Sequence, residues 1–177
     1  MGSALLRYFD RDRSRIQRIN SLRANYAGLT DERLRSAALK TGDLLEFMAL
    51  AAVAGSRVLG QELYDVQLSG ALALTRGSIA EMQTGEGKTL AAFPAIAWFA
   101  RGGQGVHVMT VNDYLSQRDA RWMGGIYEFL GLSVGCIQHS MSASERRAAN
   151  NLRPWWESRA TTSRGSKRYC TRRNFGP

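Results

Sequence analysis

Apolar side chains alternate with charged ones at helical spacing through the first sixty residues. Between residues 5 and 23 the apolar positions recur every three or four residues among arginines, which predicts an amphipathic helix with a basic face. Asp31 and Glu32 after Thr30 predict the start of a second helix. The run Thr41 to Asp43 predicts the start of a third helix, ending near Arg57, because acids stabilise the N-terminal end of a helix. Residues 1–60 are therefore expected to form a helical segment.

From residue 61 onward, helical stretches alternate with short stretches typical of strands. Helices are predicted at about residues 65–74 and from about Lys88, with a strand at residues 78–82 between them. Further strands are predicted at residues 106–110 and 133–137, where β-branched residues gather. The helix between those two strands is capped by Asn112 and Asp113, and Ser142 or Ser144 caps a last helix through Ala149.

This order is β-α-β-α-β-α over residues 78–149, which predicts a parallel sheet with helices on its faces. We therefore expect an α/β fold, with a helical N-terminal segment followed by an incomplete RecA-like (P-loop NTPase) parallel sheet. The expected domains are residues 1–60, a partial nucleotide-binding domain at residues 61–149, and a basic irregular tail at residues 150–177. The tail contains arginines and two tryptophans without helical or strand periodicity.

The formal charge of +9 is concentrated in the tail. Residues 151–177 hold seven Lys or Arg and one acid, which leaves 17 − 14 = +3 for residues 1–150. A basic charge usually indicates a nucleic-acid partner, but here it favours one only for the tail, where Arg and Trp together suit backbone contact and base stacking. The body of the chain is nearly neutral, so nucleic acid is not the expected partner.

Composition also limits the protein classes that the chain can belong to. The longest apolar stretches are interrupted by Glu46 and Pro94 and are shorter than the roughly 20 residues of a membrane span. No secretory signal precedes them, so a cytoplasmic protein is expected. Cys136 and Cys170 lack the spacing of a zinc or redox pair, and the two histidines lack metal-ligand partners. Beyond Mg²⁺ no metal site is expected.

A phosphate-binding loop is the clearest chemical signal in the chain. Residues 82–89 read Met-Gln-Thr-Gly-Glu-Gly-Lys-Thr, between a predicted strand and a predicted helix. Gly85 and Gly87 would let backbone N–H groups surround a phosphate at a helix N-terminus. Lys88 would contact the β- and γ-phosphates, and the Thr89 hydroxyl would bind the Mg²⁺ that bridges them. Met82 stands where the full Walker A pattern has glycine, so this is the T-G-x-G-K-T variant found in helicase-like motor ATPases.

The loop and its neighbours together resemble a known family. The matching runs are residues 65–68, 79–89, 106–108, 110–115, 117–120 and 129–132. In combination they resemble SecA, the preprotein translocase motor ATPase, from about residue 29 to residue 149. The resemblance identifies the chain with the N-terminal part of the first nucleotide-binding domain of that family.

The resemblance implies a set of site residues and partners. Gln67, whose pattern alone is typical of a surface helix residue, would read the adenine edge, since a glutamine amide can pair with its donor and acceptor. ATP and Mg²⁺ are the implied cofactors, with Thr89 as the metal residue. The implied partners are the SecY channel complex, preproteins and an anionic membrane surface, at the cytoplasmic face of the inner membrane. The implied cofactor-binding residues are Gln67, Thr84, Gly85, Glu86, Gly87, Lys88 and Thr89.

The chain departs from the family after Ala149. An acidic Asp-Glu motif that binds Mg²⁺ and polarises water is expected there, but no Asp-Glu pair follows Thr89, so no catalytic residue is assigned. A frameshifted or spliced end would produce this departure. We expect a fragment that binds nucleotide and hydrolyses little. The alternatives are a helicase-like RNA-binding ATPase, whose RNA binding would be salt-sensitive, and an inactive truncated product.

Overall fold

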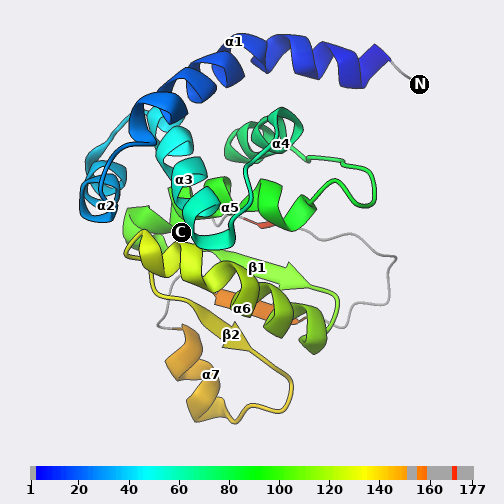
Figure 1. Cartoon of the computed structure of the whole chain (residues 1–177). Helices are drawn as coiled ribbons and strands as arrows, with labels where there is room; N and C mark the ends of the chain where they lie inside the picture. The colour runs from blue at the N-terminus through cyan, green and yellow to red at the C-terminus, as the bar shows by residue number, and fades with distance from the viewer. Residues whose placement is uncertain (1–2, 151–154, 159–168, 171–177) are drawn as a thin grey trace, which may run out of the picture. The chain divides into compact units, whose positions relative to one another are not determined.

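The computed structural model of this 177-residue chain describes residues 3–150, 155–158 and 169–170. The chain divides into two compact units, Met1–Trp98 and Phe99–Pro177. Figure 1 traces both. In the part of the chain described, no helix has both the length and the hydropathy needed to cross a bilayer.

The first unit is built from helices, and their bounds agree closely with the predicted ones. Its elements are α1 (Ser3–Tyr26), α2 (Asp31–Lys40), α3 (Leu44–Leu59), α4 (Asp65–Thr75) and α5 (Lys88–Phe99). The long helix α1 runs along α3 and α4, and α2 packs on α3 (Figure 1). Ile16 and Ile19 of α1 are buried, so the apolar face predicted for this helix is the face that packs.

Two predicted helix starts are confirmed by their N-caps. The Thr30 hydroxyl accepts a hydrogen bond from the Arg33 backbone N–H at 3.4 Å, at the start of α2. The Asp43 carboxylate accepts one from the Leu45 N–H at 2.7 Å, at the start of α3. Caps of this kind satisfy N–H groups that the first turn of a helix leaves without a partner.

The core of the first unit is formed largely by α3 and α5, whose central residues are almost all apolar and buried. A helix that is apolar around its whole circumference is one that is surrounded by protein. A methyl group added at Gly55 of α3 would lie 3.1 Å from the Phe93 ring of α5. The two helices therefore approach at a distance that only glycine allows without displacing the ring.

The strand predicted at residues 78–82 is wrong, because the structure has no regular element there. The helix α4 ends in a Schellman-type turn, with Gly77 at φ +74° and the Ser78 N–H bonded to the Ala73 carbonyl at 3.1 Å. Ile79 beyond it is 95% exposed. An apolar run becomes a strand only where a neighbouring strand accepts its hydrogen bonds and covers its side chains.

The second unit combines a small sheet with helices. Its elements are the π-helical turn η1 (Ala100–Gln104), β1 (His107–Thr110), α6 (Asp113–Phe129), β2 (Gly135–Ile137), α7 (Ala143–Asn150), β3 (Trp155–Ser158) and β4 (Tyr169–Cys170). The predicted strands at residues 106–110 and 133–137 correspond to β1 and β2. The predicted helices on either side of β2 correspond to α6 and α7.

The described strands form one sheet in the order β2-β3-β1-β4. β3 lies between its two neighbours and runs parallel to both, with His107 opposite Trp155 and Cys136 opposite Trp156. β4 pairs with β1 in the antiparallel sense. Helix α6 packs on β1, β2 and β3, and α7 packs beside β2 (Figure 1).

Both β3 and β4 lie in residues 150–177, where the sequence predicts an irregular tail. That expectation is wrong for these two short stretches. Their residues lack alternating polarity, but β3 lies between β1 and β2 and is held by backbone hydrogen bonds, which do not depend on side-chain pattern. β4 pairs with β1 alone. The rest of residues 151–177 lies outside the described residues.

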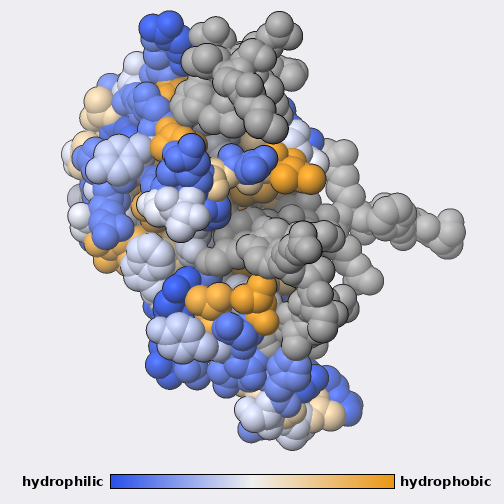
Figure 2. All heavy atoms as spheres, turned by 90° about the vertical axis from the view of Figure 1, so that its right-hand side faces the viewer, coloured by the Kyte–Doolittle hydropathy of each residue, from blue (hydrophilic) through white to orange (hydrophobic). Residues whose placement is uncertain are grey.

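Exposed apolar side chains are scattered over the described surface. On the face in Figure 2 the apolar residues form small separate groups among hydrophilic ones. The large apolar side chains that are exposed come from both units: Leu39, Val58, Tyr64, Ile79, Val111, Tyr114 and Trp122. Single exposed apolar residues are usual on soluble domains.

Candidate functional site

The predicted phosphate loop lies between the end of α4 and the first turn of α5. A tight turn forms at Thr84 and Gly85, where the Glu86 N–H donates to the Gln83 carbonyl at 3.3 Å. Gly85 occupies the third position of this turn with φ +92°. A β-turn with a positive φ at that position strongly favours glycine, so the first loop glycine is required by the backbone.

The second loop glycine is required by its surroundings as well as by its backbone. Gly87 has φ +75°, and an added Cβ would lie only 2.5 Å from the Gln67 amide nitrogen. Its carbonyl accepts the first hydrogen bond of α5, from the Ala91 N–H at 2.9 Å. Gly87 therefore joins the loop to the helix at a point where α4 leaves no room for a side chain.

Two charged side chains of the loop form hydrogen bonds to the backbone of Gln83. The Lys88 ammonium donates to the Gln83 carbonyl at 2.6 Å, and the Glu86 carboxylate accepts from the Gln83 N–H at 2.8 Å. The ammonium thus lies across the loop, with its stem in the first turn of α5. Among the described residues, the N–H groups of Gly85 and Gly87 have no hydrogen-bond acceptor.

Gln67 connects α4 to the loop. It is only 5% exposed, so the surface position that its sequence pattern favours is wrong. Its amide oxygen accepts from the Tyr64 N–H at 3.0 Å, and its amide nitrogen donates to the Glu86 carbonyl at 3.1 Å. The sequence contains no signal for the contact with Glu86, since these residues lie 19 positions apart and meet only through the packing of α4.

Of the predicted site residues, the structure thus brings Gln67, Glu86, Gly87 and Lys88 into one connected arrangement. Thr84 is exposed in the turn, and Thr89 is half-buried as the second residue of α5. The positive end of the α5 dipole faces the loop, which favours an anion there. Chemically, the loop offers glycine N–H groups, one ammonium and a hydroxyl around a helix N-terminus.

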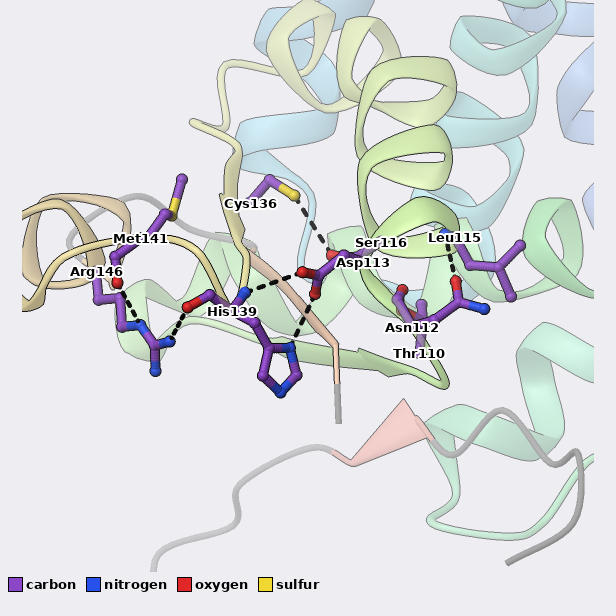
Figure 3. Close-up of polar contacts among 9 residues, drawn as sticks. All are labelled: Thr110, Asn112, Asp113, Leu115, Ser116, Cys136, His139, Met141 and Arg146. Carbon is purple, nitrogen blue, oxygen red and sulfur yellow. Dashed lines mark hydrogen bonds and ion pairs between the residues drawn. The ribbon is translucent and has the colours of Figure 1, made fainter. Parts of the chain in front are cut away.

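A second polar cluster lies in the other unit, where β1 and β2 end (Figure 3). Asn112 caps α6 as predicted, its side-chain oxygen accepting from the Leu115 N–H at 2.8 Å. Asp113, predicted as a cap, instead accepts from the His139 N–H at 3.0 Å and lies 3.1 Å from the ring nitrogen Nδ1 of the same residue. The Arg146 guanidinium donates to the His139 carbonyl at 2.9 Å.

These contacts hold the turn after β2 against the start of α6. Cys136 of β2 is a free thiol, 3.3 Å from the Ser116 hydroxyl. A hollow of about 380 Å³ lies beside it, between α6 and β2, with Arg121 and Glu128 among its lining residues. None of the predicted nucleotide-site residues lines this hollow.

Displaced pKa values occur outside the loop. The hydrogen bond that Tyr26 donates to Glu46, at 2.7 Å, raises the pKa of Tyr26 to about 12. The hydrogen bond from the Thr41 hydroxyl, followed by the one from Tyr26, lowers the pKa of Glu46. These shifts come from side-chain hydrogen bonds to Glu46 of α3 from the end of α1 and from the C-cap of α2, and they do not identify an acid or base for chemistry.

Comparison with known proteins gives one consistent family. The profile of the SecA DEAD-like domain matches residues 3–153. Protein translocase subunit SecA of Oleidesulfovibrio alaskensis is 48% identical over 159 residues, which are 84% of this chain and 18% of that protein. The subunit of Carboxydothermus hydrogenoformans is 47% identical over 150 residues, or 77% of this chain and 17% of that protein. Protein translocase subunit SecA 1 of Magnetococcus marinus is 45% identical over 161 residues, or 85% and 18%. The chain spans less than a fifth of the length of these relatives.

Proposed function

The chain belongs to the SecA family, and on that premise we propose that its glycine loop binds ATP as part of a SecA-type protein translocase motor. The observation that carries the proposal is the arrangement of Gly87, Lys88 and Gln67 at the N-terminus of α5. Gly87 has the left-handed backbone of a phosphate loop, and Lys88 follows it directly in the first turn of the helix. Thr84, Gly85 and Glu86 form the remainder of the loop.

The loop fits a polyphosphate on three grounds. The N–H groups of Gly85 and Gly87 are unbonded among the described residues, and an anion is the natural acceptor for them. The α5 dipole favours negative charge at the same place. Lys88 already crosses the loop, so binding exchanges its hydrogen bond to the Gln83 carbonyl for a stronger one to a charged oxygen.

Gln67 and Thr89 complete the proposed site. The amide of Gln67 uses one acceptor position and one N–H in the chain, which leaves one of each for the adenine edge. The Thr89 hydroxyl would bind the Mg²⁺ that accompanies the triphosphate. When bound, ATP supplies a phosphoanhydride whose hydrolysis releases the free energy that a motor uses.

We propose that this chain by itself binds nucleotide with little turnover. The carboxylates that follow Thr89 are isolated from one another in the sequence, at Asp113, Asp119, Glu128, Glu145 and Glu157. In-line attack by water requires a group that orients it beside the metal, and no Asp-Glu pair follows Thr89 in this sequence.

The wider role is proposed from the family. In the complete motor, the ATP-binding part would couple hydrolysis to export of preproteins through the SecY channel, at the cytoplasmic face of the inner membrane. The parallel pairing of β3 with β1 and β2 supports a RecA-like sheet of which this chain holds a part. On the same ground, the proposed partners are the SecY channel complex, preproteins and an anionic membrane surface.

Calorimetric titration with Mg-ATP of the wild-type chain and of Lys88→Ala tests the proposal. Losing a charge-assisted contact to a triphosphate should cost on the order of 2 kcal/mol or more, so we expect binding that is largely lost in the variant. Phosphate release measured in parallel should stay near the uncatalysed rate. Equal affinity of the two chains would refute the phosphate-loop assignment.

A further inference from the structure

An ion pair far from the loop in sequence joins α1 to the end of α4. The Asp12 carboxylate is fully buried and accepts two hydrogen bonds from the Arg76 guanidinium, at 2.9 and 2.8 Å. Arg76 is the C-cap residue of α4. A bidentate ion pair between a carboxylate and a guanidinium fixes the relative orientation of the two groups as well as their distance. It therefore holds the end of α4 in one position against α1.

The same face of α1 also holds the start of α4. The Asn20 amide donates to the Asp65 carboxylate at 2.9 Å, at the first residue of α4. Arg23 donates to the Leu63 carbonyl at 3.1 Å, just before it. Ile16 and Ile19 are buried between these polar contacts. Because residues 12, 16, 19, 20 and 23 follow helical spacing, one stripe of α1 holds α4 at both ends.

α4 also contacts the glycine loop and the start of α5. Gln67 donates to the Glu86 carbonyl and lies against Gly87. At Gly70, an added methyl group would lie 3.3 Å from the Met82 sulfur and 3.5 Å from the Ala91 methyl. α4 therefore lies between α1 and the loop, in contact with both.

We propose that Asp12 is a positioning residue for the nucleotide site, and that docking of α1 on α4 and binding of nucleotide strengthen each other. When α1 detaches from α4, Arg76 loses its two hydrogen bonds to the Asp12 carboxylate, and the buried side chains of Ile16 and Ile19 become exposed. α4 then loses the contacts that hold Gln67 under the loop. Coupling between two sites is reciprocal, so nucleotide in the loop should in turn retain α1. This inference rests on the proposed nucleotide binding.

The first test uses the wild-type chain and does not depend on how any variant at Asp12 folds. Hydrogen exchange of the α1 amides is measured with and without saturating Mg-ATP, in the wild-type chain and in Lys88→Ala. We expect Mg-ATP to slow exchange in the segment of α1 from residue 13 to residue 23 in the wild-type chain and to leave it unchanged in Lys88→Ala. An ion pair with a purely structural role would give no nucleotide-dependent change there.

The second test compares Asp12→Asn with Arg15→Ala at a temperature where both are folded. Arg15 is a matched control, because it lies 4.0 Å from the same carboxylate but is about half exposed. We expect Asp12→Asn to weaken Mg-ATP binding about fivefold or more and Arg15→Ala to leave it unchanged. An Asp12→Asn chain that does not fold leaves the first test to decide.

The outcomes separate the two proposals. A wild-type chain that does not bind Mg-ATP refutes the proposed function itself. A wild-type chain that binds Mg-ATP, with α1 exchange unaffected by the nucleotide, overturns the coupling alone. So does a folded Asp12→Asn chain with wild-type affinity.

Discussion

The two loop glycines differ in the reason that each is needed. Gly85 has φ +92° but open space around its Cα, whereas Gly87 combines φ +75° with a neighbour 2.5 Å from where a Cβ would lie. A side chain at Gly85 thus meets only backbone strain, on the order of 1–2 kcal/mol. At Gly87 it meets that strain and must also displace Gln67.

We expect both alanine substitutions to weaken Mg-ATP binding, with the larger effect at Gly87. Strain of the stated size corresponds to a loss of Mg-ATP affinity of about tenfold for Gly85→Ala. The loss for Gly87→Ala should be larger. Gly28→Ala is the control, because that glycine has ordinary φ and nothing near its Cα. Titration of the three variants checks this, and a Gly87→Ala chain that binds better than Gly85→Ala would contradict it.

At the residue scale, the sequence predicts the loop but not what supports it. The loop residues are close together in sequence, and their types follow from what a phosphate needs. The position of Gln67 beneath the Glu86 carbonyl depends on how α4 packs. From its own pattern Gln67 is typical of a surface residue, and only the family resemblance placed it in the site.

At the scale of elements, α1 and α3 are joined by a hydrogen bond that titrates. Tyr26 donates to Glu46, and the pKa of Tyr26 is raised to about 12 from an ordinary value of 10. A raised pKa adds stability below the unfolded-state value, and this is lost as pH rises through the folded-state value. The contribution should therefore be complete below about pH 10 and decline between about pH 10 and pH 12.

Tyr26→Phe should remove this part of the alkaline dependence. Urea unfolding midpoints of both chains are measured from about pH 9 to about pH 11.5. We expect the wild-type chain to lose more stability than the variant over that range, since other groups titrate alike in both. Parallel curves would show that the hydrogen bond contributes nothing.

On the acid side, the lowered pKa of Glu46 predicts loss of stability below about pH 4.5.

Another element-scale prediction concerns the start of α6. The Asn112 side-chain oxygen accepts from the Leu115 N–H, so Asn112→Ala should cost about 1 kcal/mol of unfolding free energy. Asn112→Ser keeps an acceptor and should lose much less. Urea unfolding of the three chains measures the difference, and equal loss in both variants would argue against capping as the cause.

Helices were predictable here and strands were only partly so. Caps and apolar periodicity are local signals, and they located the starts of α2, α3 and α6 at Thr30, Asp43 and Asn112. A strand depends on partners distant in sequence. Residues 78–82 precede a predicted helix but have no strand partner among the described residues, whereas β3 forms between β1 and β2 although its four residues show no alternation of polar and apolar side chains.

At the scale of the whole molecule, all the proposed nucleotide-site residues lie in the first unit, Met1–Trp98. Ligand binding to the folded state raises stability by about 2.7 kcal/mol at one hundred times Kd. We expect Mg-ATP to raise the Tm, and to slow hydrogen exchange within the first unit, in residues 62–98 and in residues 13–23 of α1. Slowing of equal size in β1 and β2 would show that the second unit also contributes to the site.

The structure divides the chain at a different place from the sequence-based domains. The expected border at residue 60 separates the N-terminal helices from the loop, whereas the first unit continues to Trp98. The reason is packing: α3 contacts α5 where Gly55 meets Phe93, and α1 contacts α4. Changes in sequence pattern mark where elements begin, but shared cores decide which of them belong together.

The buried carboxylate of Asp12 also bears on how the protein should be engineered for crystallisation. Trimming the N-terminus is a routine step, and a cut after residue 12 would look harmless because most of α1 would remain. It would remove the buried carboxylate that accepts two hydrogen bonds from the Arg76 guanidinium, and breaking a buried ion pair by removing one partner is among the more destabilising changes in a folded protein. Shortened versions should therefore begin before Asp12.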